Sequence, residues 1–265
     1  KEYTIGKIRP GHVNWIGAWT LYKKEVLRFF IVWIQTLLSP LITSLLFLVV
    51  LTLAIGSNRG LVLGENFIVF LAPGLIAMQV IQQAFSHTSS SMMIGKIQGN
   101  IVDILYAPLS PAEVTLAIIL AGCTRSIVIT IISIPVYLFF VDLEIVNFFY
   151  VIAFTCLGSF ILGAAGFITG LWSEKFDHMA SITNFLIVPL SFLSGTFYTI
   201  ERLPDILQKI CLINPFFYII DGFRAGFIGA SDGSLKIGMI YLLLLSFVTW
   251  FIAYYLYKKG YKIKT

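Results

Sequence analysis

Long apolar runs separated by short polar segments dominate this chain of 265 residues. A helix needs about 20 apolar residues to cross a hydrocarbon core of about 30 Å. Six runs meet that length, so the pattern predicts an all-α integral membrane protein with a six-span domain at residues 29–257 and tails at 1–28 and 258–265. The predicted spans cover residues 29–55, 67–91, 114–140, 148–172, 179–198 and 235–257.

The segment between the fifth and sixth runs differs from both a span and a polar loop. Pro204 is placed to begin a short helix, and Asn214-Pro215 ends it and opens a second. Each piece is too short to cross the bilayer, so residues 204–229 are predicted to form a re-entrant helical hairpin buried in protein. An amphipathic surface loop is the alternative. The hairpin positions singled out are Pro204, Asn214, Pro215, Phe216, Tyr218, Asp221 and Arg224.

Aromatic and basic side chains recur at three- and four-residue steps between residues 13 and 28. Indole rings beside Lys and Arg suit the headgroup layer, so this stretch is predicted to be an amphipathic interfacial helix on the cytoplasmic face. A soluble helix that binds a partner is not excluded by the pattern. The residues that define the helix are Trp15, Trp19, Tyr22, Lys23, Lys24 and Arg28.

Polar residues form a stripe in the second run, after a break expected at residues 72–74. Lipid does not tolerate such a stripe, so it is predicted to face protein or a water-filled path. For His87 a packing role is favoured over a proton relay, because no carboxylate partner is evident. Arg125, in the third run, either snorkels or pairs across helices. The candidates for lining the path are Gln35, Gln79, Gln83, His87, Ser90 and Asn184.

Two segments are predicted to lie on the inner side, between spans two and three and between spans four and five. In the first, apolar residues at 97, 101, 104 and 105 indicate a short amphipathic helix on the membrane surface, and a plain connector is the alternative. The second is the short turn at residues 173–178. In span four, four glycines that include a GxxxG step predict close helix packing.

Composition and charge support the membrane assignment. The chain is 58% hydrophobic and 12% charged, against about 25% charged residues in soluble domains. Basic residues gather in both tails, so both termini are predicted to be cytoplasmic in a bacterial inner membrane protein. The first apolar run is too long for a cleavable signal sequence. Three widely spaced cysteines suggest neither a metal site nor a disulfide framework.

Motifs for catalysis or energy coupling are not found in the sequence. It has no GxxxxGK[ST] loop, its three histidines are isolated, and no GxSxG motif occurs. Paired intramembrane carboxylates and a repeat of the two halves are also missing. We therefore expect no catalytic residue, metal or cofactor in this chain, and an energy source elsewhere. An ion-gradient-driven carrier or channel and a membrane-embedded lipid-modifying enzyme are the alternatives.

Four segments carry a resemblance to a known family when taken in their order and spacing. They are Phe70-Leu71-Ala72-Pro73-Gly74-Leu75, the segment NIVDILYAPLSP at 100–111, LSGTFY at 193–198, and NPFFY at 214–218 with DGFRAGF at 221–227. With these motifs the chain resembles, over nearly its whole length, the membrane permease subunit of type-2 ATP-binding-cassette exporters. Its nearest relatives look like permeases for drugs, lipo-oligosaccharides or polysaccharides.

The resemblance implies a homodimer bound to two cytoplasmic ATPase subunits, which would hold ATP and Mg²⁺, and no nucleic-acid partner. The substrate would be amphipathic, lipid-linked, a glycan or a drug. Spans one, two and five would face the path, and the hairpin would line or close its outer end. The interfacial helix would contact the ATPase, as would residues of the two inner segments. Those residues are Lys96, Ile97, Ile101, Asp103, Leu105, Tyr106, Glu174, Lys175 and Asp177.

Overall fold

The computed structural model describes residues 12–55 and 60–263, so the basic residues Lys1, Lys7 and Arg9 of the predicted tail lie outside it. The described residues are almost entirely helical, with two π-helices (η1, η3) and one 3-10 helix (η4). The elements are α1 Trp15–Ile31, η1 Ile34–Leu38, α2 Ser39–Ile55, α3 Phe67–Ile97, α4 Ile101–Tyr106, α5 Pro111–Leu138, α6 Phe148–Trp172, α7 Phe176–Ile182, η3 Thr183–Ile187, α8 Val188–Leu193, η4 Ile200–Arg202, α9 Asp205–Ile213, α10 Pro215–Ile228 and α11 Leu235–Lys258.

Six helical segments of the described chain are long and apolar enough to cross a membrane. This confirms the predicted all-α membrane fold. A further pair, α9 and α10, bends by 83° at Asn214, which agrees with the predicted hairpin. The six segments are Ile34–Ala54, Phe67–Ile97, Pro111–Leu138, Phe148–Trp172, Phe176–Leu193 and Leu235–Lys258.

Three predicted details are wrong. The first span begins at Ile34 rather than at residue 29, because α1 continues to Ile31 before a short break. The predicted break at residues 72–74 does not occur, since α3 runs straight through Pro73. Gly74 instead allows close packing: a Cβ there would lie 2.8 Å from the Thr196 carbonyl oxygen. The fifth span ends at Leu193 rather than at residue 198, because the chain turns at Gly195, whose φ is +74°.

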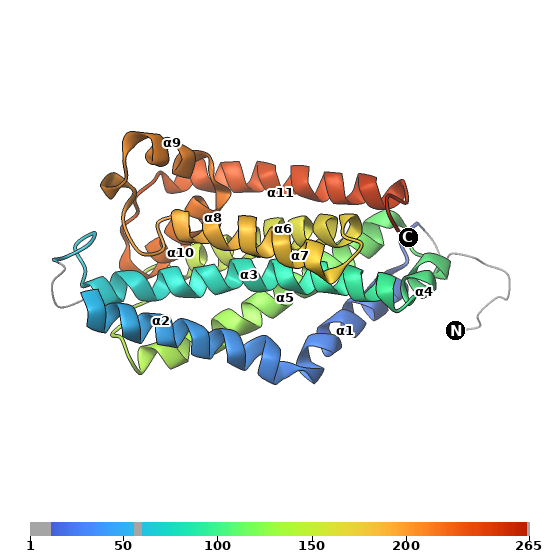
Figure 1. The fold of residues 1–265 in the computed structure, drawn as a ribbon, viewed down its shortest axis with the longest axis horizontal. Helices are drawn as coiled ribbons and strands as arrows, with labels where there is room; N and C mark the ends of the chain where they lie inside the picture. The colour runs from blue at the N-terminus through green and yellow to red at the C-terminus, as the bar shows by residue number, and fades with distance from the viewer. Residues whose placement is uncertain (1–11, 56–59, 264–265) are drawn as a thin grey trace.

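Helix α3 lies in the middle of the bundle, with α11 on one side of it and α2 on the other (Figure 1). Of the 18-residue apolar stretch of α3, 78% is buried inside the protein. The corresponding share is 17% for Ile34–Ala54, 22% for α11 and 11% for Phe176–Leu193. The poorly buried spans therefore offer their apolar sides to lipid or to another subunit. Helix α4 and the end of α11 lie at one end of the bundle, and α9 lies at the other (Figure 1).

The glycines of α6 bring its backbone against α3. A Cβ at Gly170 would lie 2.8 Å from the Ser89 carbonyl oxygen and 2.6 Å from Met92 Cβ. One at Gly166 would overlap the Thr88 hydroxyl and the Phe85 carbonyl. Such contact distances leave no room for a side chain, so the predicted close packing of this GxxxG step is confirmed.

Candidate functional site

A cavity of about 600 Å³ lies along α3 from Leu75 to Ile94, between that helix and the η1–α2 segment. Its volume is within the range of about 300–1,000 Å³ that is typical of small-molecule sites. The polar residues that line it are Arg28, Gln35, Thr36, Ser39, Thr43, Ser44, Gln79, Gln82, Gln83, Ser86, His87, Ser90 and Arg125. The polar stripe of the second span thus faces a cavity rather than lipid.

Five of the six predicted path-lining residues meet at this cavity, namely Gln35, Gln79, Gln83, His87 and Ser90. The sixth, Asn184, does not line it and is exposed on the π-helix η3. Span five contributes Met179 to the lining instead. Spans one, two and five therefore all supply residues to one cavity, while a role of these residues in transport stays a prediction.

Gln79 joins three helices at the cavity wall. Its Nε2 donates to the Pro40 carbonyl at 3.2 Å and to the Ser44 hydroxyl, both on α2. Its Oε1 accepts from Ser133 Oγ of α5 at 3.3 Å. Because its amide is satisfied within the protein, Gln79 positions α2 and α5 against α3.

Arg125 reaches the cavity from α5 and is only 7% exposed. Its Nη2 donates to Gln83 Oε1 of α3, so the guanidinium pairs across helices, one of the two alternatives that the sequence left open. Its Nε has no hydrogen-bond partner among the residues that the structure describes. No carboxylate of residues 12–55 or 60–263 lies within ion-pair distance of it.

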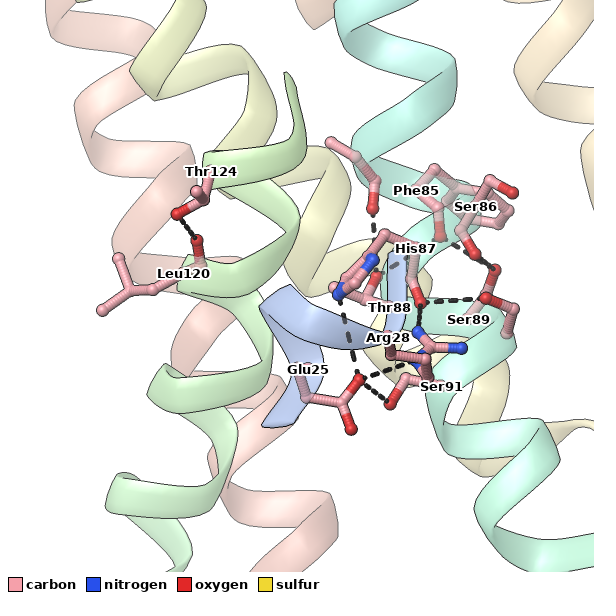
Figure 2. Close-up of polar contacts among 12 residues, drawn as sticks. Glu25, Arg28, Phe85, Ser86, His87, Thr88, Ser89, Ser91, Leu120 and Thr124 are labelled. Atoms are coloured by element: carbon pink, nitrogen blue, oxygen red, sulfur yellow. Dashed lines mark hydrogen bonds and ion pairs between the residues drawn. The ribbon is translucent and has the colours of Figure 1, made fainter. Parts of the chain in front are cut away.

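Polar contacts join helix α1 to α3 near His87, as Figure 2 shows. The carboxylate of Glu25 accepts hydrogen bonds from Ser91 Oγ at 2.7 Å and Arg28 Nε at 3.1 Å. Arg28 Nη2 in turn donates to the His87 carbonyl at 3.0 Å. Glu25 Oε2 also lies 3.9 Å from His87 Nε2, so the expectation that this histidine has no carboxylate partner was wrong.

The Glu25 cluster should contribute strongly to the stability of α1 on the bundle. We expect Glu25→Ala to lower the free energy of unfolding by about 2 kcal/mol, because two charge-assisted hydrogen bonds are lost and Arg28 is left unpaired. Thermal unfolding of the purified chain measures this, with Lys24→Ala, an exposed change on the same helix, as the control. Equal unfolding temperatures for both variants would show that the cluster does not hold α1.

The other predicted residues of α1 divide between two faces. Trp15 and Trp19 are exposed, at 76% and 64%, and Lys23 and Lys24 also point outward. Tyr22 faces inward and its hydroxyl hydrogen-bonds Thr124 of α5 at 2.7 Å. The exposed aromatic face fits the predicted contact with headgroups or a partner.

Lys96 does not lie in the short inner helix as predicted. It belongs to the last turn of α3, as does Ile97, and the short helix is restricted to α4. The Lys96 ammonium donates to the carbonyls of Leu171 at 2.8 Å and Gly170 at 3.2 Å, and to that of Ser173. Because these carbonyls end α6, the lysine acts as a C-terminal cap.

The exposed residues of α4 and of the turn after α6 form one end of the molecule. On α4, Ile101 is buried whereas Asp103, Leu105 and Tyr106 are exposed, Tyr106 at 86%. Glu174 and Lys175 are exposed in the turn, and Asp177 is exposed in the first turn of α7, which begins at Phe176, so the turn is shorter than the predicted residues 173–178. Lys262 donates to Glu174 at 2.7 Å, and this hydrogen bond lowers the pKa of the carboxyl, so the pair is lost as pH falls through that pKa.

The hairpin of α9 and α10 is held by hydrogen bonds of the Asn214 side chain to another side chain and to backbone. Asn214 Nδ2 donates to Ser194 Oγ at 2.7 Å, and its Oδ1 accepts from the Phe216 amide at 3.1 Å, which caps α10. Phe216 is buried, Tyr218 is half-buried, and Pro204 precedes α9 as its N-cap while Pro215 begins α10. Asp221 and Arg224 are buried as well. These contacts attach the hairpin to the chain that follows α8.

Sequence reasoning missed Glu25, Gln82, Ser44 and Lys262. Glu25 looks like a solvated charge within a basic stretch, and only the contact with α3 reveals its partners. Gln82 lies beside the stripe rather than on it. Its spacing of three residues from Gln79 was the available signal that it also faces the cavity.

Comparison with known proteins agrees with this architecture. The model of the family described as "ABC-2 type transporter" matches residues 17–228. The chain is 32% identical over 238 residues to "Inner membrane transport permease YadH" of Escherichia coli (strain K12), covering 89% of this chain and 93% of the relative. It is 24% identical over 252 residues to "Nodulation protein J" of Rhizobium leguminosarum bv. viciae, covering 89% and 91%. The chain therefore belongs to the ABC-2 type transporter permease family.

Proposed function

We propose that this chain is the membrane subunit of an ATP-driven exporter in a bacterial inner membrane. Two copies would form a homodimer with two cytoplasmic ATPase subunits, which bind ATP and Mg²⁺, while this chain holds no cofactor. Both termini would be cytoplasmic. The observation that carries the proposal is a polar cavity of about 600 Å³ among spans one, two and five in a chain of this family.

The cavity supports transport of an amphipathic, lipid-linked, glycan or drug substrate. Amide, hydroxyl and guanidinium groups lie on its walls together with apolar residues such as Phe47 and Leu75. Most small-molecule sites combine a largely apolar wall with a few placed polar groups. In the proposed cycle, ATP binding by the partner closes the cytoplasmic side, moves the inner elements and releases the substrate outward.

The proposal is tested by purifying the chain together with its candidate ATPase. A stable complex, whose ATP hydrolysis needs both subunits, is the expected result. A chain that stays monodisperse and indifferent to every such ATPase would contradict it. Uptake driven by an ion gradient with this chain alone would favour a secondary carrier, and turnover of lipid by this chain alone would favour an enzyme.

The exposed side of α4 is proposed to transmit the ATPase movement. We expect Asp103→Lys together with Tyr106→Ala to reduce ATP hydrolysis by the complex about tenfold without changing the unfolding temperature, since both side chains are exposed. Loss of contacts worth about 1.4 kcal/mol corresponds to that factor. Asp142→Lys, an exposed acidic residue in the loop between α5 and α6, is the matched control. Unchanged hydrolysis in the double variant would remove α4 from the interface.

A further inference from the structure

The charge of the cavity lining is unbalanced. Two guanidinium groups, Arg28 and Arg125, line it, and its lining includes no aspartate or glutamate. The two cations differ in their surroundings. Arg28 pairs with Glu25 and has a side chain that is 29% exposed, so its charge is compensated and partly hydrated.

Arg125 is the uncompensated cation. It is 7% exposed, and within the described chain it donates one hydrogen bond, to the neutral amide of Gln83, while its Nε has no partner. Taking an ion out of water costs several kcal/mol unless an opposite charge or further hydrogen bonds compensate. An anion in the cavity would supply both, because a guanidinium binds carboxylate or phosphate oxygens with two parallel N–H donors.

His87 adds a second unsatisfied group to the same site. Its side chain is fully buried and lines the cavity, and neither ring nitrogen has a hydrogen-bond partner among the described residues, with Glu25 Oε2 at 3.9 Å from Nε2. The histidine and Gln83 are four residues apart on α3 and therefore share one helical face. Donors that are buried and unpaired at a cavity wall indicate a ligand with acceptor oxygens.

The apolar part of the lining lies further along α3. Leu75 and Met78 precede Gln83 by eight and five residues, which is about 12 and 8 Å along a helix axis. Phe47 of α2 lines the cavity with them. A molecule with its anion at Arg125 would thus place a hydrocarbon chain toward the outer half of the bundle.

We propose that this cavity binds an amphiphile with a phosphate or carboxylate headgroup, and that Arg125 is the residue that selects the anion. The inference deepens the proposed export function, on which it rests, because it names the chemical class of the substrate. The neutral Gln83 holds the guanidinium in place without cancelling its charge.

The test measures binding of radiolabelled dodecyl phosphate to the full chain in nanodiscs of zwitterionic phosphatidylcholine. We expect Arg125→Gln to weaken binding at least about tenfold, since a charge-assisted hydrogen bond contributes about 1.5–3 kcal/mol. Arg125→Lys should retain part of the affinity, and Arg202→Gln, an exposed cation at the outer end, should change nothing. Equal binding by the wild-type chain and Arg125→Gln would overturn the proposal.

Two competitors separate the headgroup from the chain. Dodecanol has the same chain without charge, and inorganic phosphate has the charge without a chain. Both should therefore displace the labelled ligand much less well than unlabelled dodecyl phosphate does. Effective competition by dodecanol would show that the site does not recognise the anionic headgroup. Equally effective competition by inorganic phosphate would show a simple anion site and overturn the assignment of an amphiphile.

Thermal unfolding without ligand separates a binding role from a structural one. Arg125→Gln removes a buried charge that has no counter-ion, so its unfolding temperature should equal or exceed that of the wild type. A marked decrease would show that Arg125 supports the fold and would overturn its assignment as a binding residue. Binding of dodecyl phosphate needs no ATPase, so the two proposals can fail separately. If the chain forms the ATPase complex but does not bind dodecyl phosphate, only this inference is refuted. If it binds dodecyl phosphate but forms no complex, only the export function is refuted.

Discussion

Arg224→Met is expected to abolish accumulation of the folded protein. The guanidinium is 1% exposed and Nη2 donates to the carbonyls of Gly195 at 2.6 Å and Thr196 at 3.3 Å. Its Cζ also lies 3.8 Å from the centre of the Phe70 ring. Methionine fills similar space but leaves both carbonyls unsatisfied, which should cost at least about 3 kcal/mol. Domains are commonly stable by about 5–15 kcal/mol, so that loss is large.

The contacts around Asp221 increase the effect. Its two carboxylate oxygens accept from the backbone amides of Asp232 at 2.9 Å and Gly233 at 3.0 Å, so the turn before α11 depends on it. Without Arg224, this 2% exposed carboxylate loses the nearby positive charge of the same helix face. One helix, α10, thus connects the end of span five to the start of span six.

Yield and unfolding temperature in detergent measure the outcome. Arg224→Lys should give an intermediate result, because an ammonium keeps the charge but lacks the planar group that lies over the Phe70 ring while Nη2 reaches both carbonyls. Arg202→Met removes an exposed arginine nearby and should behave as the wild type. Wild-type stability of Arg224→Met would mean that the hairpin is not fixed by this residue.

Gly166→Ala is expected to destabilise the bundle by about 3 kcal/mol, the upper part of the range for overpacking. The added methyl group would overlap the Phe85 carbonyl, which belongs to the backbone of α3 and cannot rotate away. Helices α3 and α6 would have to separate, and that movement would disturb the cap that Lys96 forms on α6.

The same helix supplies the control for this change. A methyl group at Gly163 would lie 3.4 Å from Ile119 Cγ2 and 3.7 Å from Thr88 Cγ2, which is ordinary van der Waals contact. Gly163→Ala should therefore leave stability equal or slightly higher, since alanine favours the helix more than glycine does. The comparison of the two unfolding temperatures decides: equal values would show that close approach at Gly166 is not required.

Features that depend on local pattern were predictable from the sequence. Span positions follow from the length of apolar runs, and the hairpin follows from Pro204 and Asn214-Pro215, because proline and its neighbour restrict the backbone locally. The stripe on α3 was visible for the same reason, since residues four apart share a face. The spacing alone placed Gln79, Gln83, His87 and Ser90 on one wall.

Features that depend on contact between distant segments were not predictable. Glu25 and His87 are 62 positions apart, and nothing local marks them as neighbours. Lys96 looks like a surface charge until α6 is placed beside it. Pro73 was read as a helix break, but packing of α3 against α10 and α6 overrides the local preference. Only the fold shows that the hydrogen-bond partner of Arg125 is a neutral amide.

The π-helix η1 has a consequence for comparing related sequences. Residues of span one that line the cavity follow a four-residue step, 35, 39, 43 and 47, with 36, 40 and 44 beside them. On an α-helix, four residues advance about 40° beyond a full turn, so this row would drift away from the cavity. The wider turn of a π-helix, closed by i→i+5 bonds, offsets part of the drift. In an alignment of such permeases, a one-residue gap within Ile34–Leu38 would therefore convert this turn to an ordinary α-helical turn and leave the lining positions on either side in place, rather than shorten a loop.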